Sequence, residues 1–193
     1  MVHIVPQIQE IGYNIERLAG QDAAQVVMED SDRIKNSTKS AKVAAWVSGA
    51  MERLDTQVDE ETRVEIMLTC GRNCALANGR VIERAQARRR KFGTEAAFLD
   101  AEQRNPPTGT RIVLEGDTLY QYYTPGSYSN PMRCYCSLMR GLPADQTTSS
   151  TYCQCSRGFA QTYWEKVLNR PVTVDIGETC LTGAQECQFI IHL

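Results

Sequence analysis

The sequence has few histidines, no long apolar run and no excess of charge, and each of these absences excludes a class of protein. Among its 193 residues there are only two histidines, His3 and His192, so a Cys–His or Ser–His catalytic arrangement is not expected. No apolar run approaches the ~18 residues that a membrane-spanning helix needs. The formal net charge is −2 at pH 7, so no overall field attracts nucleic acid or an anionic membrane.

Targeting and recognition motifs are missing as well. The N-terminal stretch has no basic start, no apolar core and no small-residue cleavage site of a secretory signal, so we expect a cytoplasmic protein. Neither a DNA-binding motif nor an ATPase motif occurs, so neither nucleic acid nor a membrane is an expected partner. Any sensory output must then pass through a separate redox or signalling partner protein.

What the sequence does have is cysteine. Eight cysteines occur in four close sets: Cys70 and Cys74, Cys134 and Cys136, Cys153 and Cys155, Cys180 and Cys187. Cytosolic thiols stay reduced, so paired cysteines indicate metal ligands or redox groups rather than disulfides. Plain buried cysteines are the alternative, but that interpretation suits isolated cysteines better than four sets.

The spacing of the first two sets predicts shared faces. Residues four apart lie on one face of a helix, so Cys70 and Cys74 can approach one metal from the helix expected there. The stretch MRCYCSLMRG, residues 132–141, reads as a strand. Cys134 and Cys136 would then point to the same side of it.

The last two sets lie beside expected turns. Cys153 and Cys155 come just before a helix, where free backbone N–H groups stabilise thiolates. Cys180 and Cys187 bracket a glycine-containing connection between two strands, with Glu178 just before it. Four thiolates suit zinc or an iron–sulfur cluster equally, so the cofactor stays undecided between these two.

Hydrophobic periodicity predicts an α+β fold. Helical spacing dominates the first half, with a break expected near Gly93, and NPPTG at 105–109 marks the boundary. Beyond it come two strands around a Gly–Asp turn, a helix from 156 to about 169, and two final strands. We therefore expect a helical part, 1–104, packed on an α/β part, 105–193, which has an antiparallel sheet and a helix near the C-terminus.

The segment from Cys153 to Leu193 resembles the vinyl-4-reductase-like domain, a small-molecule-binding α/β module. The likeness consists of a cysteine opening a helix with glycine and aromatics, then Asn-Arg-Pro-Val, a strand ending in Glu, and two cysteines around a glycine turn. Zinc-binding sensors of that family hold the metal with three cysteines and that glutamate. The resemblance implies ligation here by Cys155, Cys180, Cys187 and Glu178. Cys153 is additional to the family pattern, and if it replaces Glu178 the site becomes all-cysteine.

Four cysteines remain outside that set, and they predict a second site. Cys70, Cys74, Cys134 and Cys136 would join the helical half to the sheet. The resemblance also favours a pocket for a small organic ligand, lined by Tyr122, Phe159, Tyr163 and Trp164.

The resulting functional hypothesis is a cysteine-ligated metal-binding protein that binds or senses a small molecule. The alternative is an iron–sulfur redox protein or a metal-dependent reductase or hydrolase of anaerobic metabolism. Whether the protein is an enzyme and whether it forms a homodimer stay open at this level.

Overall fold

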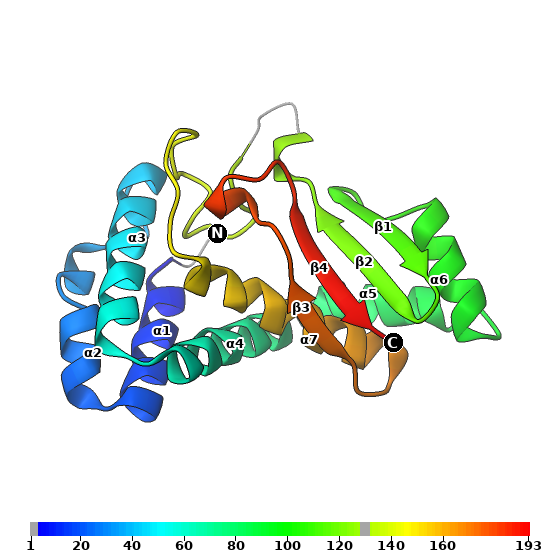
Figure 1. The fold of residues 1–193 in the computed structure, drawn as a ribbon, viewed down its shortest axis with the longest axis horizontal. Helices are drawn as coiled ribbons and strands as arrows, with labels where there is room; N and C mark the ends of the chain where they lie inside the picture. Colours follow the sequence, from blue (N-terminus) through cyan, green and yellow to red (C-terminus); the bar gives the residue numbers. More distant parts are fainter. Residues whose placement is uncertain (1–3, 128–131) are drawn as a thin grey trace.

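The computed structural model describes residues 4–127 and 132–193, and over this part of the chain the fold is α+β, as predicted. Helices fill the N-terminal half. A four-stranded antiparallel sheet and a long helix make up most of the C-terminal half (Figure 1). None of the helices in these two segments is long and apolar enough to cross a membrane. His3 lies outside the described residues.

The first three helices form a layer at one end of the molecule (Figure 1). They are α1 (Ile4–Ala19), α2 (Gln21–Val27) and α3 (Ser40–Gln57), with a short 3₁₀ turn, η1 (Ser31–Arg33), between the last two. Apolar side chains at helical spacing face inward from each, among them the fully buried Ile15, Val47 and Leu54. This face supplies most of the first of two apolar clusters.

Three more helices complete the first half: α4 (Glu60–Ala77), α5 (Gly79–Arg89) and α6 (Glu95–Arg104). The carboxylate of Asp59 accepts the N–H of Thr62 at 2.9 Å and thereby caps α4. The hydroxyl of Thr94 accepts the N–H of Ala97 at 3.2 Å and caps α6 in the same way. The helix break predicted near Gly93 is confirmed, because it lies between α5 and α6.

The sheet has the strand order β1-β2-β4-β3, and all its neighbouring strands are antiparallel. The strands are β1 (Thr110–Glu115), β2 (Thr118–Tyr123), β3 (Thr173–Ile176) and β4 (Cys187–His192). The expected Gly–Asp turn joins β1 to β2, and Gly116 adopts a φ of +58° there, a conformation that favours glycine.

One face of the sheet is covered by α7 (Gln154–Leu168). Register places Ile112, Gln121, Phe189 and Ile176 in one row across the four strands on this inner face. Because strand side chains alternate, Cys187 shares the inner face with Phe189, whereas Tyr122 and Gln188 lie on the outer face.

Helices α4 and α7 pack against each other with almost no space between their backbones. A Cβ on Gly71 would overlap the backbone carbonyl oxygen of Cys155, and a Cβ on Gly158 would overlap that of Leu68. Glycine is therefore required at both positions. This close approach brings the cysteines of α4 beside the beginning of α7, in the middle of the molecule (Figure 1).

The strand predicted for residues 132–141 is wrong. This segment is a loop of turns and bends, in which the carbonyl oxygen of Cys136 accepts the N–H groups of Met139 at 3.1 Å and Arg140 at 3.0 Å. The guanidinium of Arg133 donates to backbone carbonyl groups of loop residues. The shortest of these hydrogen bonds goes to the carbonyl of Cys180 at 2.6 Å. The residue types of this short segment did not distinguish a loop from a strand.

Candidate metal centre

All eight cysteines are free thiols, and none of them is well exposed. Cys70, Cys153 and Cys180 are buried, and Cys74, Cys134, Cys136, Cys155 and Cys187 are half-buried. They come from α4, the 132–149 loop, the start of α7 and the connection between β3 and β4. Segments far apart in the sequence thus bring their thiols to one region of the interior.

Four of the thiols, which we call the helix group, surround the contact between α4 and α7: Cys70, Cys74, Cys136 and Cys155. Cys155 lies in the first turn of α7, opposite Gly71 of α4. Burial raises the pKa of the Cys155 thiol well above its usual value, and the thiols of Cys136, Cys70 and Cys74 raise it further. Such mutual effects require these sulfur atoms to lie near one another.

Side-chain donors from other segments contact the sulfurs of the helix group. The Tyr152 phenol donates to the sulfur of Cys136 at 3.1 Å, and the Asn14 amide donates to that of Cys70 at 3.5 Å. Burial raises the pKa of Cys70 to about 12, against the opposing effect of the Asn14 hydrogen bond. Burial and the Cys136 thiol raise the pKa of Cys74 as well.

The other four thiols, which we call the hairpin group, lie near the β3–β4 connection: Cys134, Cys153, Cys180 and Cys187. The backbone N–H of Cys180 donates to the sulfur of Cys187 at 3.3 Å. The Cys153 thiol donates to the hydroxyl of Thr179 at 3.3 Å. Burial raises the pKa of Cys134, and the thiol of Cys136, followed by those of Cys187 and Cys153, raises it further, so Cys134 lies between the two groups.

Cys187 is the most acidic thiol of the hairpin group. Its pKa is lowered to about 7, chiefly by the hydrogen bond from the Cys180 thiol and also by the Cys180 N–H and the charge of Arg133, against the effect of burial. The interaction with Cys187 and burial raise the pKa of Cys180, and the Cys180 thiol donates to the backbone carbonyl of Gln185 at 3.3 Å. Cys187 is therefore the thiol that ionises first in this pair.

The sulfurs are not arranged around a single ion. Within residues 4–127 and 132–193, no group of three or more His, Cys, Asp or Glu side chains is placed to hold one metal ion. Zinc binds thiolates at about 2.3 Å, so the sulfurs around it must lie close together. A mononuclear zinc site is therefore not preformed in this part of the chain.

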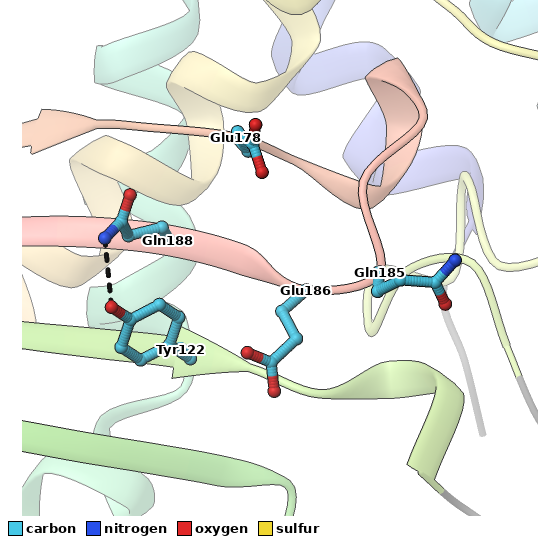
Figure 2. A pocket seen from close by; sticks show the side chains of 5 residues that line it. All are labelled: Tyr122, Glu178, Gln185, Glu186 and Gln188. Atoms are coloured by element: carbon cyan, nitrogen blue, oxygen red, sulfur yellow. Dashed lines mark hydrogen bonds between the residues drawn. The ribbon is translucent and has the colours of Figure 1, made fainter.

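Glu178, expected from the resemblance to act as a ligand, lies elsewhere. Its side chain is exposed and lines a pocket of about 300 Å³ with Tyr122, Gln185, Glu186 and Gln188 (Figure 2). In that pocket the amide of Gln188 donates to the phenol of Tyr122 at 3.0 Å. The pocket lies beside the hairpin that carries Cys180 and Cys187 but on the outer side of the sheet.

Of the four aromatic residues predicted to share a pocket, three pack together in the core and the fourth, Tyr122, lies on the other side of the sheet. Tyr122 lies on the outer face of the sheet, whereas Tyr163 and Trp164 are buried in the core behind the inner face. The indole N–H of Trp164 donates to Gln121 at 2.9 Å, and Phe159 packs half-buried against the same core. Of the four, only Tyr122 lines the pocket described above.

Several contributors to the thiol region carry no signal in the sequence. Asn14 lies 56 positions before the cysteine that it contacts, and Arg133 reaches 47 positions along the chain to Cys180. Tyr152 could have been suspected, because it directly precedes the pair Cys153 and Cys155.

The fold and the site together define an α+β protein with a thiol-rich interior. The profile of a family of unknown function, DUF6144, matches residues 2–193, and the chain belongs to that family. No curated protein matches the sequence.

Solved structures with a similar course of the chain are distant in sequence. An H-NOX domain from Shewanella oneidensis, solved in the Fe(II)CO ligation state, is 16% identical with a TM-score of 0.42, covering 100% of this chain and 98% of that one. The phenol-responsive sensory domain of the transcription activator PoxR, solved with phenol, is 14% identical with a TM-score of 0.42, covering 80% of this chain and 74% of that one. At this distance the likenesses identify no ligand for this chain.

Proposed function

We propose that this protein is a cysteine-ligated metalloprotein that binds or senses a small molecule, and that its cofactor is an iron–sulfur cluster. The convergence of eight free thiols from four chain segments carries the proposal. A buried thiol that binds no metal is a weakly hydrogen-bonded polar group, and an apolar side chain could fill its place in the core. The gathering of eight thiols in the interior therefore favours metal ligation.

The geometry favours a cluster over zinc. In a cluster, iron atoms and sulfides separate the thiolates, so its cysteines stand further apart than those around one zinc ion. The described thiols influence one another but form no single-ion site, and this arrangement leaves room for the larger cofactor. When bound, such a cofactor supplies one-electron chemistry or a ligand-sensitive metal.

The N–H and O–H groups that point at the sulfurs would stabilise thiolates. Besides the side-chain donors already described, the backbone N–H of Cys136 donates to the sulfur of Cys134 at 3.4 Å. Hydrogen bonds of this kind raise the reduction potential of a cluster. They favour the second candidate function, an iron–sulfur redox protein or a metal-dependent reductase or hydrolase.

The sensor part of the proposal is supported by the pocket of Figure 2. Three of its residues, Gln185, Glu186 and Gln188, flank Cys187 in the chain. A small organic ligand bound there would contact the same hairpin whose residues include two of the cysteines. The resemblance of the segment from Cys153 to Leu193 to vinyl-4-reductase-like domains supports the same proposal.

Anaerobic purification followed by metal and sulfide analysis tests the cofactor. We expect a brown protein with broad absorbance near 400 nm and stoichiometric iron and acid-labile sulfide. A colourless protein that contains zinc would show that the cofactor is zinc and not an iron–sulfur cluster. A protein that binds neither metal, even after reconstitution with ferrous iron and sulfide, would refute ligation.

Glu178→Gln is the matched control for that measurement. Its side chain is exposed and lines the pocket, so we expect unchanged iron and sulfide content. A Cys155→Ser variant, altered at a thiol in the interior, should lose iron and sulfide under the same conditions.

A further inference from the structure

We infer that the pocket of Figure 2 binds a small organic cation, one that carries a guanidinium, amidinium or ammonium group. Because this names the chemical class of the ligand, it rests on the sensor part of the proposed function. The residues that carry it are those of the pocket and one neighbouring arginine, and none of the thiols takes part.

The lining of the pocket is polar and acidic. Two of its five residues are glutamates, Glu178 and Glu186, two are glutamines, and Tyr122 is the only aromatic residue among them. The two glutamates lie on either side of the beginning of β4 (Figure 2). Pockets for small organic ligands usually measure about 300–1,000 Å³ and are mostly apolar. A pocket of about 300 Å³ with this lining therefore suits a compact, charged ligand.

The chain's own guanidinium already occupies a cation site beside this pocket. The guanidinium carbon of Arg111 lies 3.5 Å from the centroid of the Tyr122 ring. A terminal nitrogen of the same group donates to the carboxylate of Glu186 at 2.5 Å. A ring face and a carboxylate both attract a planar organic cation. Two of the lining residues thus have the geometry that holds a guanidinium.

Glu178 is the carboxylate that Arg111 leaves unpaired. Within residues 4–127 and 132–193, its side chain makes no hydrogen bond and no ion pair. The two glutamates contribute a charge of −2 and Arg111 a charge of +1, so this group of three has a net charge of −1. A ligand with one positive charge would neutralise the group, whereas Glu178 would repel an anion.

The wall of the pocket between the two glutamates is held in place. The amide of Gln188 donates to the phenol of Tyr122 at 3.0 Å. The amide oxygen of Gln188 rests against Gly177, where a Cβ would overlap it. A preformed wall lowers the entropy cost of binding, because fewer side chains become ordered when the ligand binds.

The test uses three probes of similar size and shape that differ in charge: benzamidinium, benzamide and benzoate. Isothermal titration calorimetry with the full chain measures the dissociation constant of each. We expect benzamidinium to bind about tenfold more tightly than the other two, as one hydrogen bond to a charged group can supply. Equal or tighter binding of benzamide or benzoate would overturn the inference, and so would a lack of benzamidinium binding.

Three substitutions then locate the site. Glu178→Gln should weaken benzamidinium binding by roughly tenfold, because it removes the unpaired carboxylate. Arg111→Gln should strengthen binding severalfold, because Glu186 and the Tyr122 ring then become open to the probe. Glu115→Gln is the matched control for the loss of one negative charge, since Glu115 lies on the same outer face of the sheet but outside the pocket. Equal effects of Glu178→Gln and Glu115→Gln would overturn the site.

The three substituted side chains, Arg111, Glu115 and Glu178, are exposed, so we expect the variants to fold, and circular dichroism verifies this. Weaker benzamidinium binding by Arg111→Gln, together with a preference of the wild-type protein for benzoate, would show that the pocket is an anion site and overturn the inference. A protein that contains iron and sulfide but does not bind benzamidinium overturns this inference alone. A protein that binds benzamidinium but no metal refutes the ligation and supports the cation site.

Discussion

At the scale of single residues, the core contains a polar pair that apolar packing does not explain. Trp164 is fully buried behind the sheet, and its indole N–H donates to the side-chain oxygen of Gln121, which is 6% exposed and lies on the inner face of β2. A buried amide costs free energy unless it is hydrogen-bonded. The pair therefore fixes the orientation of both side chains between α7 and the sheet.

Trp164→Phe removes the donor and leaves the Gln121 oxygen unpaired in the core. We expect the free energy of unfolding to fall by about 1–3 kcal/mol from the unpaired group, with a further loss from the smaller ring. Urea unfolding followed by circular dichroism measures the change.

The chain's only other tryptophan supplies a control for that substitution. The indole N–H of Trp46 donates to the Glu29 carbonyl at 2.9 Å in an exposed hydrogen bond, so water can replace it. Trp46→Phe should cost less than Trp164→Phe. Equal losses from the two substitutions would show that the buried pair has no special role.

At the scale of secondary-structure elements, the contact between α4 and α7 determines where the thiols meet. The helix backbones approach each other at Gly71 and Gly158, and Cys155 lies directly at this contact. A helix normally disfavours glycine by about 1 kcal/mol relative to alanine. Close backbone approach offsets that cost here, because no side chain fits.

Gly158→Ala tests this contact. The new methyl group would meet the Leu68 carbonyl, so α4 and α7 must move apart, and we expect a loss of about 1–3 kcal/mol in the free energy of unfolding. The iron and sulfide content should fall too, because the shift displaces Cys155 relative to Cys70.

The matched control is Gly79→Ala at the start of α5. A Cβ there meets nothing within 4 Å, so stability should stay the same or rise slightly. If Gly158→Ala were as well tolerated as Gly79→Ala, the close approach of the two helices would not matter for the fold.

At the scale of the whole molecule, the thiols lie where two apolar clusters adjoin, beside the close packing of α4 on α7. The core is divided between a cluster of α1, α3 and α4 residues and a cluster around α5, α6, α7 and the sheet. The 132–149 loop and the β3–β4 connection have little regular structure apart from η4 (Cys180–Thr182). Both segments carry cysteines of the hairpin group.

Removing the cofactor should therefore loosen these two segments while the sheet persists. Treatment with a chelator under reducing conditions should lower the melting temperature by roughly 10 °C. This is the shift expected on removal of a ligand whose free concentration is about 1,000 times its dissociation constant. Hydrogen exchange with mass spectrometry should show lost protection at 132–149 and 177–187. The β1–β2 hairpin serves as the internal control, and equal protection with and without cofactor would contradict the prediction.

Much of the fold could be predicted from local patterns. The helices at 40–57 and 60–77 follow apolar spacing and, for the second, an acidic first turn, and the Gly116 turn joins two alternating strands as expected. Residues 132–141 were mispredicted, because a short segment of this composition is compatible with both a strand and a loop. The hydrogen bonds of Arg133 to distant carbonyls decide for the loop, and they have no local signature.

Cysteine count and spacing predict a thiolate-bound cofactor, because ligand chemistry is a property of residue type, and this stays a prediction that metal analysis tests. The surroundings of the thiols were decided by the packing of α4 on α7 and by the 3₁₀ turn η3 (Ser150–Cys153), since these place the backbone of cysteines that are close in sequence. Cys153 and Cys155 are two residues apart yet point to different neighbours, and Cys70 and Cys155 are 85 positions apart yet meet. Contacts between residues so far apart in the sequence form only when the chain has folded.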